Sequence, residues 1–170
     1  MNKARRCVAV IGLVLLGIVV AMPVAEAAKW HTKKHPLFAV HDGTRYAKAY
    51  GNFYKYRSES AHSMAWEYDI HPGTENGHGV YVETQFYWDG PAAKIGECGD
   101  PRSYGSCWWP DVKKQSARTT GTRPHWEKHF RARDLDPGES AARGYIKVCL
   151  DRRYFRPDWC SAHVVKSFGF

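Results

Sequence analysis

Hydrophobic and polar residues alternate most regularly in two neighbouring segments, residues 63–70 and 80–88. In the first segment large side chains occupy every second position from Met64 to Ile70, and small or acidic side chains stand between them. The second segment alternates in the same way. A period of two indicates β-strands, and residues 71–79 supply Pro, Gly and Asn for a turn. We therefore expect the two strands to form an antiparallel hairpin.

Weaker alternation indicates further strands. Aromatic rings alternate from Tyr46 to Tyr56, where Gly51 is expected to mark a bulge at which the faces switch. Extended segments are also expected at residues 125–133, 144–150 and 160–170. No segment carries the i, i+3, i+4, i+7 apolar spacing of an amphipathic helix. About six to eight short strands at this spacing predict one all-β, antiparallel β-sandwich instead of a large barrel.

The N-terminus predicts export. A basic start, an uncharged apolar run from Cys7 to Met22 and the small-residue sequence Ala25–Ala27 indicate a signal peptide at residues 1–27. The apolar run is shorter than the roughly 20 residues of a membrane-spanning helix, so no transmembrane anchor is expected after signal removal. Residues 28–44 show no sustained period and predict an N-terminal arm ending in a turn, which leaves residues 45–170 for the sandwich.

Signal removal changes the composition. The formal net charge falls from +8 to +6, spread along the chain, which favours solubility and a bias toward anionic surfaces.

Four cysteines remain, and in an oxidising compartment they predict two disulfides. Of three possible pairings we favour Cys98–Cys107 and Cys149–Cys160, because each pair is close in sequence. A four-cysteine zinc site is disfavoured because Cys-x2-Cys ligand pairs are absent from the sequence. Neither a metal nor another cofactor is expected.

Two short stretches resemble known proteins. Leu135-Asp-Pro-Gly-Glu139 resembles the Leu-x-Pro-Gly-Glu turn of immunoglobulin-like sandwich domains. The stretch from Tyr145 to Cys160 resembles the carboxy-terminal cysteine hairpin of small secreted actinobacterial β-sandwich proteins of unassigned function. These resemblances imply a secreted, immunoglobulin-like sandwich with a stapled hairpin, and they imply no catalytic residue.

Catalytic and metal-binding patterns are weak. His125 and His129 would share a metal on a helix, but on a strand they lie about 13 Å apart, so a solvated strand face is the expectation. The histidines near the start of the arm lack the spacing of a metal site; they are His31, His35 and His41. Glu67 or Asp69 could form a carboxylate pair with Glu83 if the expected hairpin aligns them. This arrangement would suit a small secreted hydrolase, glycosidase-like or ribonuclease-like.

Binding has more support in the sequence. About thirty residues after residue 90 lack convincing periodicity, and a loop of this length is commonly functional. It carries aromatic and basic side chains that could contact a ligand: Tyr104, Trp108, Trp109, Lys113 and Lys114. An exposed ring flanked by lysines would suit a sugar, a protein or an envelope surface. The alternative is that both tryptophans pack beneath the loop as a small additional core. We therefore expect a secreted, non-catalytic binding protein whose partner is a protein, a glycan or the cell envelope, and we expect no nucleic acid partner.

Overall fold

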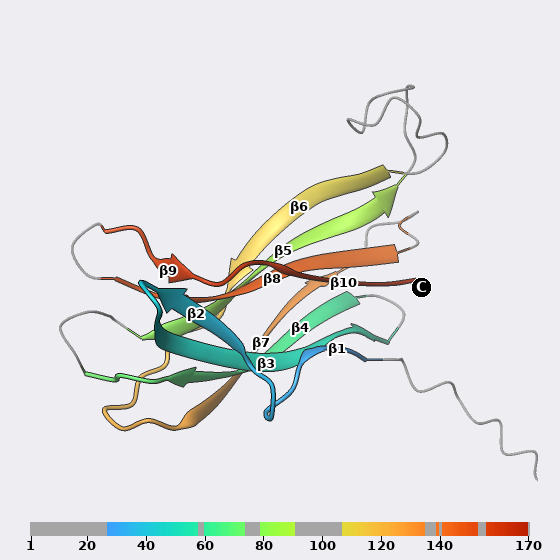
Figure 1. Cartoon of the computed structure of the whole chain (residues 1–170). Helices are drawn as coiled ribbons and strands as arrows, with labels where there is room; N and C mark the ends of the chain where they lie inside the picture. The colour runs from blue at the N-terminus through green and yellow to red at the C-terminus, as the bar shows by residue number, and fades with distance from the viewer. Residues whose placement is uncertain are drawn as a thin grey trace, which may run out of the picture.

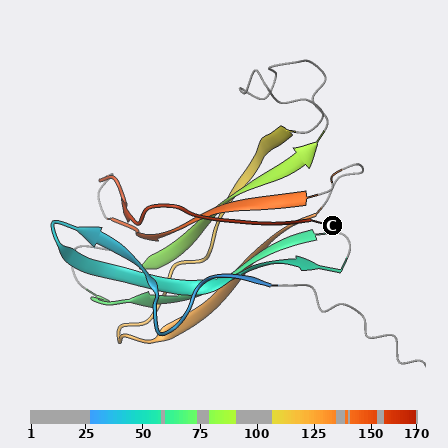
Figure 2. The same cartoon turned by 45° about the vertical axis from the view of Figure 1, so that its right-hand side comes forward.

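The computed structural model describes residues 27–57, 60–73, 79–90, 107–134, 139, 141–152 and 156–169. Two antiparallel sheets face each other, and both views of the cartoon show the two layers (Figures 1 and 2). Sheet A consists of β1 (Ala28–His31), β2 (Leu37–His41), β3 (Thr44–Tyr56), β4 (Ser60–Asp69) and β7 (Trp126–Asp134). Sheet B consists of β5 (Val80–Gly90), β6 (Cys107–Gln115), β8 (Ala141–Leu150), β9 (Trp159–Cys160) and β10 (Val164–Gly169).

The strand order confirms the predicted sandwich. Sheet A runs β1-β3-β4-β7, with β2 also on β3, and sheet B runs β10-β8-β5-β6, with β9 also on β8. The chain therefore changes sheet after β4, β6 and β7. The arrangement of β3-β4-β7 opposite β6-β5-β8-β10 is a Greek-key order of the immunoglobulin-like type. Across the described ranges no helix has the length and apolar character needed to cross a bilayer.

The expected hairpin between β4 and β5 is wrong. β4 pairs with β3 and β7, whereas β5 pairs with β6 and β8 in the other sheet. Alternation identifies a strand but not its partner, and the connection after β4 crosses the sandwich instead of turning back. β6 was not expected at all. Its register against β5 shifts between Gln85 and Tyr87, and this irregularity, next to Pro110, interrupts the period of two.

Residues 28–44 differ from the expected arm. β1 and β2 both pair with β3, and Trp30 and Ala39 are buried in the core. The expected turn is present between β2 and β3, where Asp42 and Gly43 have φ of 47° and 75°, as a tight hairpin turn requires. The register also shifts beside Gly51, but the shift lies in β1 and the faces of β3 do not switch there.

The core lies between the sheets. Its largest fully buried side chains include Phe53, Phe86 and Ile146, and the inward positions of β3 and β4 carry mostly small residues. The predicted Cys149–Cys160 disulfide is confirmed, joining β8 to β9. The other predicted bridge stays a prediction, because Cys98 lies outside the described residues. The expected signal peptide, apart from Ala27, and the turn at 135–138 also lie outside them.

Candidate aromatic binding face and a buried polar pair

The outward face of sheet A carries large aromatic side chains and lysines. The inward positions of β4 are buried, so the alternate positions must point away from the core. The cross-strand register places nine outward side chains in three rows. We call these nine residues the aromatic face: Lys48, Tyr68 and Trp126; Tyr50, Trp66 and Lys128; Asn52, Met64 and Phe130. Among the described elements no third layer covers this face.

The rings of the aromatic face pack against one another. Tyr50 stacks on Trp66 with ring centroids 5.1 Å apart and planes inclined by 3°. Trp126 meets Tyr50 edge-on at 4.9 Å and Tyr68 at 5.0 Å. Each such pair contributes about 0.5–1.5 kcal/mol beyond the burial of area. The rings are therefore held in place before any ligand arrives, which lowers the entropy lost on binding.

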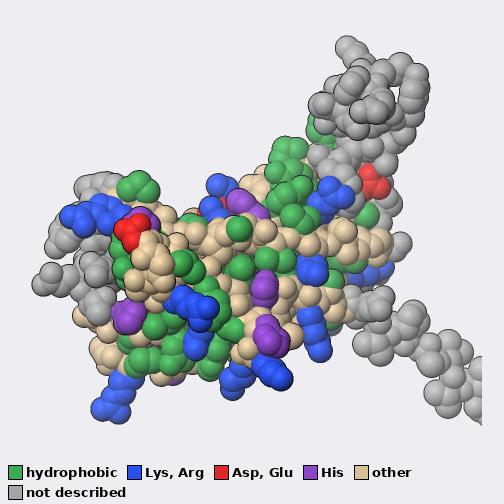
Figure 3. Space-filling model, in the orientation of Figure 1, with side chains coloured by type: hydrophobic (Ala, Val, Ile, Leu, Met, Phe, Trp, Pro, Cys, Tyr) green, Lys and Arg blue, Asp and Glu red, His purple; other side chains and the backbone are tan. Residues whose placement is uncertain are grey.

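Two lysines of the aromatic face lie over its rings. Lys48 Nζ lies 4.0 Å from the centroid of Tyr68, and Lys128 Nζ lies 5.2 Å from that of Trp66. None of the nine residues is acidic, although Asp134 ends β7 at the border of the sheet. Figure 3 shows basic side chains along the lower side of the molecule, the side of sheet A, with no described acidic side chain visible there. Phe130 is 61% exposed, so the face presents both apolar and positively charged groups to solvent.

A groove of about 240 Å³ adjoins the aromatic face. It lies between the turn that follows β1 and the rings of β3 and β4. Its lining consists of Lys29, His31, Thr32, Lys33, Tyr50, Asn52 and Trp66. The aromatic face thus continues into a concave site with polar walls.

The residues predicted from the long loop lie elsewhere. Tyr104 lies outside the described residues, and so does the side chain of Trp108. Trp109 is half-buried and stands opposite Trp88, on the inner face of sheet B. Lys113 Nζ lies 3.6 Å from Glu83, and Lys114 Nζ donates to a backbone carbonyl at 2.5 Å. The structure does not bring these described side chains onto the aromatic face.

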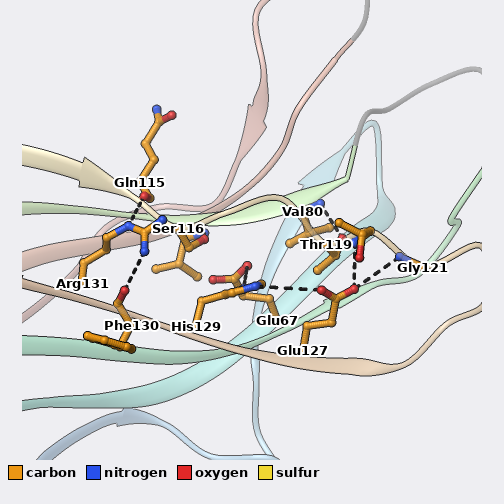
Figure 4. A network of polar contacts seen from close by, with 12 residues as sticks. Glu67, Val80, Gln115, Ser116, Thr119, Gly121, Glu127, His129, Phe130 and Arg131 are labelled. Carbon is orange, nitrogen blue, oxygen red and sulfur yellow. Dashed lines mark hydrogen bonds and ion pairs between the residues drawn. The ribbon is translucent and has the colours of Figure 1, made fainter.

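A buried polar pair occupies the other face of the same strands. Glu67 on β4 is fully buried, and its Oε2 lies 3.2 Å from Nδ1 of His129 on β7. Glu127 lies beside them, 3.9 Å from His129, and accepts hydrogen bonds from the backbone of Thr120 and Gly121 (Figure 4). The expected solvated face for His129 is therefore wrong, because this side of β7 is turned toward the interior.

The pKa values of both members of this pair are raised, but for different reasons. Desolvation raises the pKa of Glu67 above its usual value, and the contact with His129 opposes that shift. The hydrogen bond to Glu67 raises the pKa of His129, against partial desolvation. The adjoining cavity, which Ser63 and Thr84 also line, has a volume of about 10 Å³. That is at most the room of one water molecule, so no substrate fits beside the pair.

The third candidate carboxylate, Glu83, is also buried, but it lies on the opposite face of sheet B. Glu83 points away from the core of sheet B, where its Oε1 lies 3.0 Å from Lys147 Nζ. Thr84, next to it on β5, points inward and shares a 2.7 Å hydrogen bond with Ser63 of β4. Sheet B therefore separates Glu83 from Glu67, and the expected alignment of these carboxylates is wrong. Asp69 is buried at the end of β4 and accepts a hydrogen bond from the backbone of His71.

Within the described part of the chain, no three His, Cys, Asp or Glu side chains converge as metal ligands would. His31 and His125 each use Nδ1 to contact a backbone carbonyl, of His35 and Arg123 respectively, both at 2.8 Å. Because a carbonyl only accepts, Nδ1 carries the proton in both rings.

Comparison with known proteins adds no relative. The chain matches no family model, no curated protein and no solved structure. The assignment of function therefore depends on the chemistry of the aromatic face and the buried pair.

Sequence reasoning missed the aromatic face, although a signal for it was present. Lys48 alternates in phase with Tyr50, and Lys128 alternates in phase with Trp126. An unpaired lysine is very rarely buried, so the ring-bearing side of each strand had to be the outer one.

Proposed function

We propose that the protein is a secreted, non-catalytic binding protein that contacts a glycan, a protein or the cell envelope through the aromatic face. The observation that carries the proposal is the outward stack of Tyr50 and Trp66 flanked by Lys48 and Lys128. Preformed aromatic and basic surfaces of this kind suit recognition, since rings supply large contact area at low entropic cost. The Cys149–Cys160 disulfide is compatible with an oxidising, extracellular location.

The positions of the carboxylates favour binding over the hydrolase alternative. A glycosidase needs two carboxyl groups on either side of one bond, but Glu67 is buried between the sheets and Glu83 lies on the outside of sheet B. The small cavity beside Glu67 also excludes a substrate.

A retention assay with envelope and culture-supernatant fractions tests the proposal. We expect the purified protein to retain a specific component at low and moderate salt, and Trp66→Ala to lose it. Tyr145→Ala is the matched control, because Tyr145 also stands half-buried on an outer sheet face, with its ring 4.8 Å from that of Tyr87. If both variants retain the component equally, or if nothing is retained, the aromatic face is not the contact surface.

A further inference from the structure

The groove beside Tyr50 has the size and walls of a subsite for a single ring. Its volume of about 240 Å³ is smaller than the roughly 300–1,000 Å³ of sites for drug-sized ligands. Tyr50 and Trp66 form its aromatic side, and stacking against such rings is open to any ligand with an apolar face. The groove is therefore suited to one monosaccharide ring within a longer chain that continues over the aromatic face.

The positive charge of the groove favours a sugar ring that carries a negative charge. Lys29 and Lys33 line the groove and are exposed, and the seven lining residues include no carboxylate. Lys48 and Lys128 lie over the neighbouring rings. A negatively charged ligand would therefore meet cations in the groove and along the face beyond it.

The turn that carries Lys33 is held in place before binding. Thr32 and His35 exchange two backbone hydrogen bonds, of 3.3 and 3.0 Å. His31 Nδ1 donates to the carbonyl of His35, which leaves Nε2 of the same ring as an acceptor in its neutral form. Asn52 adds an amide that both donates and accepts. The lining thus offers an acceptor and donors for sugar hydroxyl groups, in addition to the lysines.

We propose that this groove binds a uronic acid residue of an acidic oligosaccharide, with the sugar ring against Tyr50 and Trp66 and the carboxylate at Lys29 and Lys33. This inference rests on the proposed function, because the groove continues the aromatic face and the inference names the ligand that both would bind. A single-stranded nucleic acid also combines rings with negative charge. The sugar is favoured because the groove takes one ring with hydroxyl groups, whereas each nucleotide brings a base, a ribose and a phosphate.

The test compares two ligands with the same sugar rings, of which one is charged and the other is neutral. Tetragalacturonate and its methyl ester, which has the same rings without the charge, are titrated into the purified protein by calorimetry and tryptophan fluorescence. We expect the acid to bind at least about tenfold more tightly than the ester, because two exposed lysine–carboxylate contacts together supply about 1.4 kcal/mol. The double variant Lys29→Gln/Lys33→Gln should lose about the same factor for the acid and little for the ester.

Lys34→Gln is the matched control, since Lys34 is an exposed lysine in the same turn that does not line the groove. It should change the affinity for the acid by less than about twofold. Equal binding of acid and ester overturns the inference; if Trp66→Ala then weakens both ligands, the proposed function stands. No binding of either sugar, or tighter binding of a thymidine octanucleotide, also overturns the inference. The envelope-retention assay decides the proposed function separately.

Discussion

Replacing His129 with leucine tests whether the buried pair is structural. Nδ1 of His129 lies 3.2 Å from Oε2 of Glu67, and at an effective dielectric constant of about 20 that separation corresponds to roughly 5 kcal/mol of attraction. The desolvation of both groups offsets much of this attraction. Removing one partner leaves the other without compensation, which costs about 3–5 kcal/mol in buried pairs. Because the His129 side chain is 20% exposed, we expect the lower end of that range.

Urea unfolding at pH 6 measures the loss as a change in the free energy of unfolding. The double variant Glu67→Leu/His129→Leu is the control, because it removes both charges together. It also removes Glu67 Oε1, a buried oxygen that has no hydrogen-bond partner among the described residues. We expect the double variant to recover most of the stability that His129→Leu loses. A cost below about 1 kcal/mol for His129→Leu would refute the reasoning.

The same pair predicts a dependence on pH. The raised pKa of His129 gives stability that is fully present below its usual value of 6.5 and is lost as the pH rises through the folded-state value. The raised pKa of Glu67 acts in the same direction, since burial of the carboxylate costs more as the pH rises above 4.5. The native protein should therefore lose stability relative to the double variant between pH 5 and pH 9. Groups shared by both proteins cancel in this difference, and a flat profile would contradict both pKa directions.

Three smaller perturbations test the rest of the fold. Replacing Cys149 and Cys160 with serine should lower the free energy of unfolding by about 2–3 kcal/mol, as for other short disulfide loops; an unchanged denaturant midpoint would contradict this. Gly144→Ala should cost about 1–3 kcal/mol by overpacking, because its Cβ would lie 2.9 Å from the ring of Phe53; a melting temperature equal to that of the native protein would show that the ring can move. Tyr81→Phe removes a 2.6 Å hydrogen bond to the carboxylate of Asp158, which precedes β9. It should lower the free energy of unfolding in urea by about 1.5–3 kcal/mol; an unchanged value would show that this hydrogen bond does not stabilise the fold.

The strands could be predicted from the sequence because alternation is a local property. β4, β5 and β8 appear as clear periods of two, and each is present in the structure. The pairing of the strands could not be predicted in the same way. After β4 the chain crosses to the other sheet, and that crossing depends on the packing of the whole core. Near Pro110 the irregular register of β6 hides the alternation that would have identified it.

The candidate site could not be predicted from alternation alone either. The period of β4 separates Trp66 from Glu67 correctly, but a period alone does not say which side is buried. Hydrophobicity favours burying the tryptophan, and the structure does the opposite. The 2.7 Å bond between Ser63 and Thr84 shows that the sheets approach closely at this point. Small and polar side chains fit there, whereas the large rings remain outside and cover one another.

The buried pair and the aromatic face are connected through the register of β4 and β7. Glu67 stands opposite Glu127, and Trp66 stands opposite Lys128. A slip of one residue between strands would turn every side chain of the strand to the other face, placing a carboxylate outside and a tryptophan against the narrow interior. The contact between Glu67 and His129 disfavours that slip, because it forms only in the observed register. The inner polar contact therefore specifies the spacing of rings and lysines outside, so a loss of the pair should disturb the aromatic face even where the sandwich still folds.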